Sequence, residues 1–572
     1  MAELFKHDLL IFGSGLAGLR AAVEAARASG GKLDIGIISK VQLMRSHSVC
    51  AEGGTAAMMR PEEGDSYELH AWDTVKGSDF LADQDVVDRF VQAMPAEILQ
   101  LDHWGIPWTR RPDGRIEQRP FGGHSFPRAV LAADKTGFFE MQTLYDTLLK
   151  YGNVTRYDEW FVTAIFTEAG KFHGLSAINM RSGDLHGFIA KALIIATGGI
   201  GNLFGFTTYS QTVTGDGMAI AYRAGLPLED LEFLQFHPTG LIPSGILMTE
   251  ACRSEGGYLR NKDGERFMAK YTPTKMELAP RDMVSRSEMI EIEEGRGFTG
   301  PRGLDFVYLD LTHLGAEKIN SRLPLIREVA IKFIGVDPIH EPIPVRPVAH
   351  YAMGGIETDI NGATNVKGIW VAGEAACVSL HGANRLGSNS TAECLVWGKI
   401  TGQEALNYIH HNGQLPAAPT DRLQEEEQRI FGELIHRNGK ESLYQIKAEL
   451  RTTMDKNVGV FRTRQGLETA LAKVQELKNR FANIAIKDKT RAFNTDLTTA
   501  LEVQNMLGLA EVLVSGALVR EESRGAHARR DFPNRDDERW LKHTLAFYTP
   551  TGPRLDYKPV TITNWQPVER KY

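Results

Sequence analysis

Gly13-Ser14-Gly15-Leu16-Ala17-Gly18 is the stretch of sequence that decides the fold. An apolar run at 9–12 precedes it, and residues 16–28 carry apolar side chains at helical spacing, which predicts a strand, a tight turn and a helix. Glycines at this spacing permit the turn, and the N-terminus of the helix then faces the pyrophosphate of a dinucleotide. The sequence therefore predicts a dinucleotide-binding domain, with Gly13, Ser14, Gly15, Ala17 and Gly18 at the cofactor.

Three further segments extend this prediction outward from the glycine turn. Residues 34–39 form the next expected strand, and Ser39-Lys40 stand where NAD-binding domains usually carry an acidic ligand for the ribose, which argues against a plain NAD site. Residues 191–196 and 368–372 are two more apolar strands, and each is followed by glycine. The dinucleotide-binding domain is therefore expected to be split along the chain.

The predicted fold class is α/β, with a discontinuous Rossmann-like domain, an inserted α+β capping domain and a C-terminal helical domain. A chain of 572 residues is too long for one compact core. We place the first part of the split domain at 1–234, the capping domain at 235–341, the second part at 342–415, the helical domain at 416–525 and a C-terminal segment at 526–572. Residues 520–539 are dense in both signs of charge, and we interpret them as a solvated surface.

Composition restricts the class of function. The formal net charge of −7 argues against general binding to nucleic acid. The four cysteines, at positions 50, 252, 377 and 394, lack CxxC spacing, so neither a metal site nor iron–sulfur ligation is expected. The N-terminal residues have no signal-peptide pattern, and we find no apolar run of about 18 residues, so the chain is not expected to span a membrane by itself.

The most specific motif in the chain is Arg45-Ser46-His47-Ser48-Val49-Cys50-Ala51-Glu52-Gly53-Gly54. It resembles the flavin-attachment motif of succinate dehydrogenase and fumarate reductase flavoproteins. The resemblance implies FAD bound covalently, with the histidine at position 47 joined to the flavin 8α carbon, and Ser48 replaces the threonine that is usual in the family. It covers nearly the whole chain, including Thr214-Gly-Asp216-Gly, Gly373-Glu374 and 385–390.

The motif matches assign further residues to the cofactor. In addition to the glycine turn, the predicted FAD-binding residues are Ser39, Lys40, Ser46, His47, Ser48, Glu52, Gly53, Gly54, Thr197, Gly198, Asp216, Glu374, Ser388, Ser390 and Thr391.

Glu52 occupies a position where the family carries either Glu or Gln. An ionised carboxylate near the flavin would disfavour the addition of electrons and lower the flavin potential, so Glu52 is expected to lean the chain weakly toward fumarate reduction.

The substrate that the resemblance implies, succinate or fumarate, is small, flat and doubly charged. Its carboxylates need several donors on a locally cationic site, although the chain as a whole is acidic. The residues that match the family's dicarboxylate ligands are His237, Thr249, His350 and Arg385, and Phe121 matches a residue that packs beside the substrate.

Proton transfer is expected to depend on three charged residues. Arg281 matches the family's proton-transfer residue, and a carbanion formed beside a carboxylate is basic enough to take a proton from a positioned guanidinium. Glu250 and Arg253 lie three residues apart, hence on one face of a helix, and match the relay that restores this proton.

Three functions remain open from the sequence. The first is a quinone-linked respiratory subunit of complex II type, belonging to electron transport and the tricarboxylic acid cycle. The resemblance then implies an iron–sulfur partner and a membrane anchor, with this chain held peripherally on the cytoplasmic side of the membrane. The second is L-aspartate oxidase, whose resemblance lacks the flavin-linking histidine. The third is a flavin-containing RNA-binding or RNA-modifying protein, against which the acidic charge counts.

Overall fold

The computed structural model describes residues 3–572, and its largest sheet has seven strands. Its strands are β1 (Leu4–Phe12), β2 (Ile35–Ser39), β6 (Val154–Asp158), β7 (Trp160–Glu168), β8 (Lys171–Asn179), β9 (Leu185–Ile195) and β16 (Ile369–Val371). They follow the order β6-β2-β1-β9-β8-β7, and β16 also pairs with β9. The pairs β1-β2, β1-β9, β2-β6 and β9-β16 are parallel, whereas β7-β8 and β8-β9 are antiparallel. Segments far apart in sequence thus complete one sheet, which confirms the split α/β domain.

The glycine turn joins β1 to helix α1 (Leu16–Ala28), the helix predicted from the sequence. Gly13 has a φ of +112°, and a Cβ atom added there would lie 2.2 Å from the carbonyl oxygen of Ala196. A Cβ atom on Gly18 would lie 2.1 Å from the carbonyl oxygen of Gly13. Only glycine allows the turn and the helix to approach the strands this closely.

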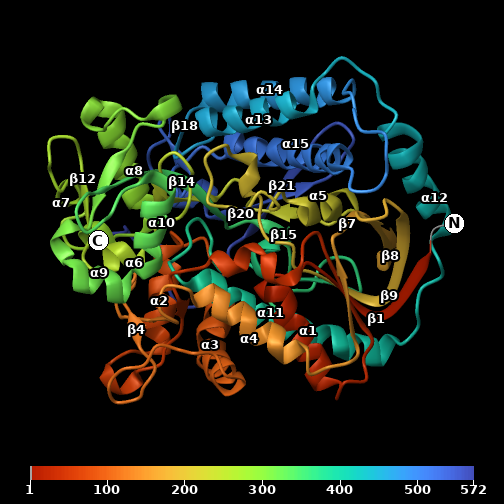
Figure 1. Cartoon of the computed structure of the whole chain (residues 1–572), viewed down its shortest axis with the longest axis horizontal. Helices are drawn as coiled ribbons and strands as arrows, with labels where there is room; N and C mark the ends of the chain where they lie inside the picture. The colour runs from red at the N-terminus through yellow and green to blue at the C-terminus, as the bar shows by residue number, and fades with distance from the viewer. Residues whose placement is uncertain (1–2) are drawn as a thin grey trace.

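Helix α1 packs along helix α11 (Asn389–Asn412), beside which it lies in Figure 1. Two glycines of α11 make this contact possible. A Cβ atom on Gly398 would lie 2.8 Å from the carbonyl oxygen of Ala17, and one on Gly402 would lie 2.7 Å from that of Ala21. The close approach fixes the start of α11, where the predicted cofactor residues Ser388, Ser390 and Thr391 lie, relative to α1.

The capping segment has its own sheet and its own apolar core. Its antiparallel strands, in the order β11-β14-β13-β12, are β11 (Leu234–Leu241), β14 (Ile343–Ala352), β13 (Val307–Asp310) and β12 (Tyr258–Arg260). Its helices, which form the green end of the molecule in Figure 1, are α6 (Ala251–Ser254), α7 (Met268–Tyr271), α8 (Arg281–Glu291), α9 (Ala316–Arg322) and α10 (Pro324–Ile334). Strand β14 pairs with β11 although it lies beyond the boundary that we predicted at residue 341, because the sheet needs both strands to close over its core.

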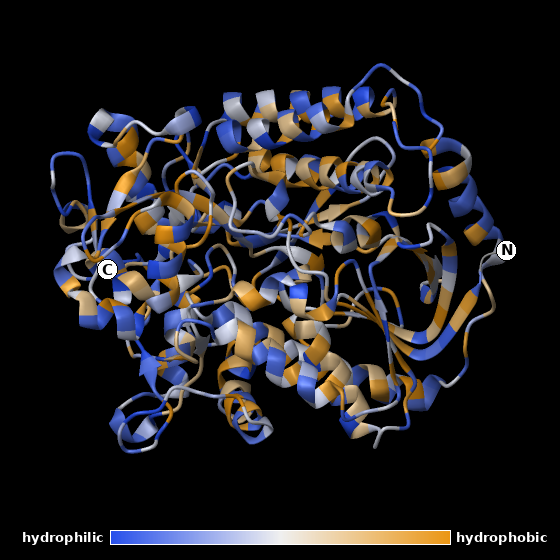
Figure 2. Ribbon diagram, in the orientation of Figure 1, coloured by the Kyte–Doolittle hydropathy of each residue, from blue (hydrophilic) through white to orange (hydrophobic). Residues whose placement is uncertain are grey.

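Helices dominate the C-terminal third, as the apolar spacing predicted. They are α12 (Thr420–Glu427), α13 (Leu443–Asn457), α14 (Arg464–Phe481) and α15 (Thr495–Val519). Figure 2 shows α15 as largely apolar and α14 as mixed in polarity. By length and composition α15 could cross a membrane, contrary to our reading of the sequence, but 67% of its apolar window is buried inside the chain. It packs against α13, α14 and α5 (Asp216–Arg223), as a core helix does.

The C-terminal segment returns to the first domain through a five-stranded sheet, in the order β17-β15-β10-β20-β21. These strands are β17 (Ala376–Cys377), β15 (Gly355–Glu357), β10 (Leu228–Glu229), β20 (Lys542–Phe547) and β21 (Arg554–Pro559). The remaining strands and α-helices are β3 (Thr55–Ala56), β4 (Gln118–Arg119), β5 (Ala129–Val130), β18 (Phe461–Arg462), β19 (Ala528–Arg529), α2 (Tyr67–Gly77), α3 (Gln84–Trp104), α4 (Thr136–Leu148) and α16 (Asp537–Trp540).

The expectation that residues 520–539 form a solvated surface is wrong for the first half of the segment, where 522 and 524–529 are buried, whereas 530, 531, 533, 534, 538 and 539 are exposed as predicted. Arg520, Glu522 and Arg524 are at most 1% exposed. Their charges are buried because they pair with one another and with backbone carbonyls, which satisfies the hydrogen-bonding groups that burial would otherwise leave without water.

Candidate active site

One cavity of about 570 Å³ runs from the glycine turn to the capping segment. Every site residue predicted from the sequence lines it except Gly18 and Arg253. Gly18 does not line the cavity but lets α1 pack closely against the turn. Arg253 does not line it either, and it contacts Glu250, which does. Residues from widely separated stretches of the chain therefore meet at one site, although their individual roles remain predictions.

The turn end of the cavity is built by hydroxyl groups and one ion pair. The hydroxyl groups of Ser14 and Ser39 lie 2.6 Å apart, and the amide of Leu16 donates to the Ser48 hydroxyl over 3.1 Å. The ammonium of Lys40 lies 2.7 Å from Asp216 and 2.8 Å from Glu502 of α15. Lys40 and Asp216 thus form part of the wall and already bind each other.

The polar lining of this end fits a dinucleotide. Within residues 3–572, the Thr197 and Ser388 hydroxyl oxygens and one carboxyl oxygen of Glu52 are buried without a hydrogen-bond partner, and all three residues line the cavity. Buried polar atoms without partners cost about 1–3 kcal/mol each, which a ligand carrying ribose, phosphate and ring heteroatoms would offset.

His47 lies in a short 3-10 turn, His47–Cys50, and lines the cavity. The backbone amide of Ser210 donates to its Nδ1 over 3.4 Å, and the ring of Tyr209 stacks on it. Burial lowers the pKa of His47 to about 4, so the imidazole is neutral near pH 7. A neutral imidazole has the lone pair that bonding to carbon requires.

Glu52 does not support the electrostatic argument made from the sequence. Its side chain is buried, and burial, assisted by the nearby charge of Asp134, raises its pKa well above the ordinary value for a carboxyl group. A neutral Glu52 adds no negative charge beside a flavin. The expected lean toward fumarate reduction therefore loses its physical basis.

The capping end of the cavity gathers cations and donors. The rings of His237, from β11, and His350, from β14, have centroids 4.9 Å apart, and the Thr208 hydroxyl lies 2.9 Å from Nδ1 of His350. Burial first, and then the charge of Arg281, hold the pKa of both histidines well below the ordinary value. They are therefore neutral and can each present an N–H.

Arg385 is held in place by the backbone and by neighbouring side chains. Its Nη1 donates to the Ser390 hydroxyl over 3.1 Å, its Nη2 to Gln235 over 3.2 Å, and its guanidinium lies over the ring of Tyr351. In the part of the chain that the structure describes, Nε of Arg385 and Nε2 of His237 have no hydrogen-bond partner. These free donors face the same cavity, as a site for an anion requires.

Phe121 closes the wall beside these donors. A Cβ atom on Gly53 would lie 2.9 Å from the ring of Phe121, so glycine at position 53 lets the ring approach the attachment motif. Thr249 lines the same region of the cavity, immediately before Glu250. The structure therefore brings all five predicted substrate residues together.

The three predicted proton-transfer residues form one chain of contacts. Nε of Arg281, at the start of α8, donates to Glu250 over 2.7 Å, and Nη2 of Arg253 lies 3.7 Å from the same carboxylate. Glu250 precedes α6, which contains Arg253, so the spacing of three residues does place them on one face. Burial lowers the pKa of Arg281 to about 9, although the negative charge of Glu250 opposes the shift.

Sequence reasoning missed two residues at this site. Gln235 accepts from both Arg281 and Arg385 and so couples the two cations. It lies two residues before His237 on β11, and the alternation of side chains along a strand was a signal that could have revealed it. Tyr209 gave no signal, because its contact with His47 depends on how two loops fold together.

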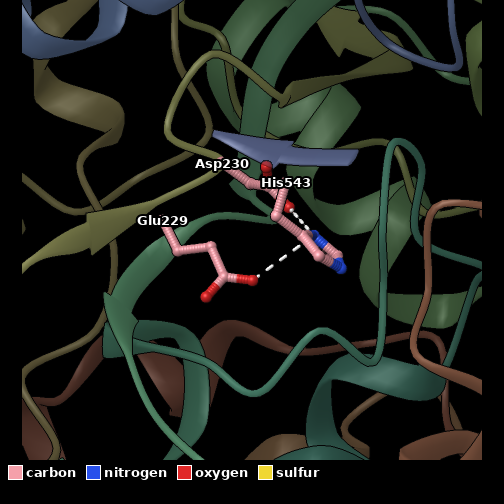
Figure 3. Close-up of side chains that lie close together, drawn as sticks. All are labelled: Glu229, Asp230 and His543. Carbon is pink, nitrogen blue, oxygen red and sulfur yellow. Dashed lines mark hydrogen bonds and ion pairs between the residues drawn. The ribbon is translucent and has the colours of Figure 1, made fainter. Parts of the chain in front are cut away.

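A group of potential metal ligands, Glu229, Asp230 and His543, lies outside the cavity. Figure 3 shows the carboxylates of Glu229 and Asp230 approaching the same ring nitrogen of His543, Nδ1, at 3.3 Å and 2.6 Å. These acids raise the pKa of His543 to about 10, and Lys558 also binds Glu229. These ligand atoms already form ion pairs that connect β10 and the residue after it to β20. We therefore assign the group a structural role.

Comparison with known proteins agrees with this geometry. Residues 8–391 match the family described as FAD binding domain, and residues 447–572 match the family described as fumarate reductase flavoprotein C-term. The fumarate reductase flavoprotein subunit of Mycobacterium tuberculosis is 48% identical over 99% of each chain. The succinate dehydrogenase flavoprotein subunit of Rickettsia conorii is 43% identical over 98% of this chain and 96% of the other. A solved Escherichia coli quinol fumarate reductase has a TM-score of 0.96 and 45% identity, with 99% of each chain covered. The chain binds FAD and belongs to the family of fumarate reductase and succinate dehydrogenase flavoprotein subunits.

Proposed function

We propose that this chain interconverts succinate and fumarate at an FAD attached covalently to His47. The observation that carries the proposal is the lining of the cavity, in which a neutral imidazole shares one space with the glycine turn and with a group of cationic and neutral donors. Relatives named as fumarate reductase and succinate dehydrogenase subunits support this function over L-aspartate oxidase and over an RNA-modifying protein.

The donors at the capping end would bind the two carboxylates. Arg385 supplies a fixed cation, and His237, His350 and Thr249 supply neutral donors. Together they would hold a flat dianion in one orientation, with one face of its central carbons toward the flavin. Phe121 would cover the other face of the substrate and exclude water. When bound, FAD supplies the exchange of hydride with the substrate.

Arg281 would give a proton to the substrate carbon during fumarate reduction and take it back during succinate oxidation. A pKa near 9 leaves the guanidinium charged at pH 7 but closer to proton transfer than an ordinary arginine. Glu250 and Arg253 then return the proton through their contacts with Arg281. The same three charges are fixed before substrate arrives, which lowers the cost of stabilising the transition state.

We infer that electrons leave through an iron–sulfur subunit to a quinone-linked membrane anchor, and that the chain is held peripherally on the cytoplasmic side of the membrane. Two similar solved structures support a quinone-linked assembly: one is titled as a quinol-fumarate reductase with menaquinol molecules, and one Mycobacterium smegmatis structure was solved in complex with UQ1. The domain division at 234, 341, 415 and 525 remains part of the proposal.

The test combines activity with flavin attachment. The purified assembly should reduce fumarate and oxidise succinate with artificial electron carriers, and flavin fluorescence should stay with the acid-precipitated chain on a denaturing gel. His47→Ser should keep FAD without a covalent bond and lose more succinate oxidation than fumarate reduction, because the covalent link raises the flavin potential. Activity on L-aspartate without either dicarboxylate reaction would overturn the proposal, and flavin lost entirely to the supernatant would overturn the covalent link.

A further inference from the structure

Tyr209 contacts both His47 and Glu374 in the wall of the cavity. Its ring stacks on the imidazole with centroids 5.1 Å apart and planes inclined by 20°. Its hydroxyl donates to Oε1 of Glu374, which also accepts from the backbone amide of Ala352 over 2.9 Å. The side chain is only 4% exposed. One aromatic residue therefore joins the attachment motif to the segment after β16.

The chain leaves room for this ring at two glycines. A Cβ atom on Gly201 would lie 1.8 Å from the ring of Tyr209. A Cβ atom on Gly199 would lie 2.2 Å from the Glu374 carboxylate and 3.0 Å from the Tyr209 hydroxyl. The ring and its partner thus occupy space that a side chain at either position would fill, which makes the stack a built feature of the wall.

The neighbouring residue holds the same imidazole from its edge. The amide of Ser210 donates to Nδ1 of His47, so Nδ1 accepts with its lone pair and Nε2 carries the proton of the neutral ring. Burial and the charge of Glu374 raise the pKa of Tyr209 well above its ordinary value, so the phenol keeps its proton and remains a donor. Face and edge contacts together fix the plane of the imidazole ring.

We propose that Tyr209 is a positioning residue for covalent attachment of FAD, holding the His47 imidazole in the plane from which it bonds to the flavin. The inference rests on the covalent link in the proposed function. Attachment joins an imidazole nitrogen to the 8α carbon, and one proton leaves the nitrogen and one leaves the carbon. The electron pair of the broken C–H bond passes to the isoalloxazine ring and from there to fumarate or dioxygen.

A displaced ring would slow this step because bond formation needs the reacting atoms aligned within a narrow range. Misplacement by about 1 Å can cost on the order of 100-fold in rate. Removing the aromatic face frees the imidazole to rotate, whereas removing the hydroxyl alone leaves the stack in place. The two kinds of substitution therefore separate positioning from the hydrogen bond to Glu374.

The experiment measures covalent attachment over time. The full chain is produced with its partner subunits in flavin-limited cells, FAD and fumarate are added, and fluorescence on denaturing gels is divided by total bound FAD. Tyr209→Leu and Tyr209→Gln should attach at least tenfold more slowly than wild type, and Tyr209→Phe within threefold. Tyr222→Leu removes another buried tyrosine outside the cavity and should attach at the wild-type rate.

The outcomes are distinct. Attachment at the wild-type rate in both the Leu and Gln variants, or in whichever of them binds FAD, would overturn the role of Tyr209 and leave the proposed function intact. A tenfold loss in Tyr209→Phe as well would also overturn it, because the stack would then not be the cause. Wild-type protein that binds FAD without any covalent link would overturn the covalent attachment itself, and this inference with it.

Discussion

Two groups of buried arginines and acids in this chain differ in one respect. In the C-terminal charge cluster, which comprises Glu232, Arg520, Glu522, Arg524, Arg535 and Asp537, the cations are matched by acids. Arg520 binds Glu232 and Glu522 at 2.9 and 3.0 Å, and Arg524 binds Glu522 at 2.8 Å. At the capping end of the cavity, Nε of Arg385 is buried without a hydrogen-bond partner among the described residues.

The difference teaches how to recognise a binding site among buried charges. Burial alone does not distinguish the groups, because Glu232, Arg520, Glu522 and Arg524 are at most 1% exposed and Arg385 is 2% exposed, while Arg535 and Asp537 form the partly exposed edge of the cluster. A donor left unpaired inside a protein costs about 1–3 kcal/mol, and more when it is charged. The cavity group has an unpaired donor next to the cavity, where a bound dianion can accept its hydrogen bond. In the C-terminal cluster the charged groups pair with one another and support the fold.

The largest expected effect comes from breaking the cavity group. Arg281→Leu should lower kcat by on the order of 10² to 10⁴, the usual contribution of a general acid, while a dicarboxylate still binds. Steady-state assays in both directions measure the loss, with flavin absorbance reporting binding. Arg286→Leu, on the same helix but paired with Asp282, is the control. A loss below tenfold for Arg281→Leu would reject its role in proton transfer.

Breaking the C-terminal charge cluster should cost stability instead. Glu522→Leu leaves Arg520 and Arg524 without their shared acid, and removing one partner of a buried pair typically costs about 3–5 kcal/mol. Denaturant unfolding measures the loss, and kcat per bound FAD should not change. Glu521→Leu removes the adjacent acid, which pairs with Arg464 at the surface, and should cost less than about 1 kcal/mol. Equal costs for the two variants would mean that the cluster is not a structural support.

The pH dependence of fumarate reduction should report the pKa of Arg281. Fumarate reduction needs Arg281 protonated, so kcat/KM should be constant below its pKa of about 9 and fall above it. Because the charge of Glu250 raises that pKa, Glu250→Gln should move the fall to lower pH, in addition to slowing the reaction. A wild-type profile that stays flat to pH 10.5, or a fall that does not move in Glu250→Gln, would contradict this assignment.

The smallest effect concerns Glu52. Because burial keeps this carboxyl protonated, Glu52→Gln exchanges one neutral side chain for another and should shift the flavin midpoint potential by less than roughly 10 mV. An ionised Glu52 would instead give a rise of some tens of millivolts. Redox titration at pH 7 separates the two, with the exposed Glu62→Gln as control. A rise of that size would restore Glu52 as evidence about direction.

Sequence predicts those parts of this molecule in which neighbours along the chain determine the structure. The glycine turn, helix 16–28 and the His47 motif are local patterns, and each lies where it was expected. Residues 520–529 were misjudged because a charged side chain gives the same sequence signal whether it meets water or a distant partner such as Glu232. Tyr209 escaped notice for the same reason, since only the folded chain brings it to His47.

The most direct test of the comparison is to titrate a dicarboxylate into matched arginine variants. Malonate, a dianion that cannot react, is followed through flavin absorbance in wild type, Arg385→Leu and Arg535→Leu, the last from the C-terminal charge cluster. Losing a hydrogen bond to a charged group costs about 1.5–3 kcal/mol, so Kd should rise at least about tenfold in Arg385→Leu. Arg535→Leu should stay within twofold of wild type. Similar affinities in wild type and Arg385→Leu would contradict the assignment of the cavity cations to the dicarboxylate.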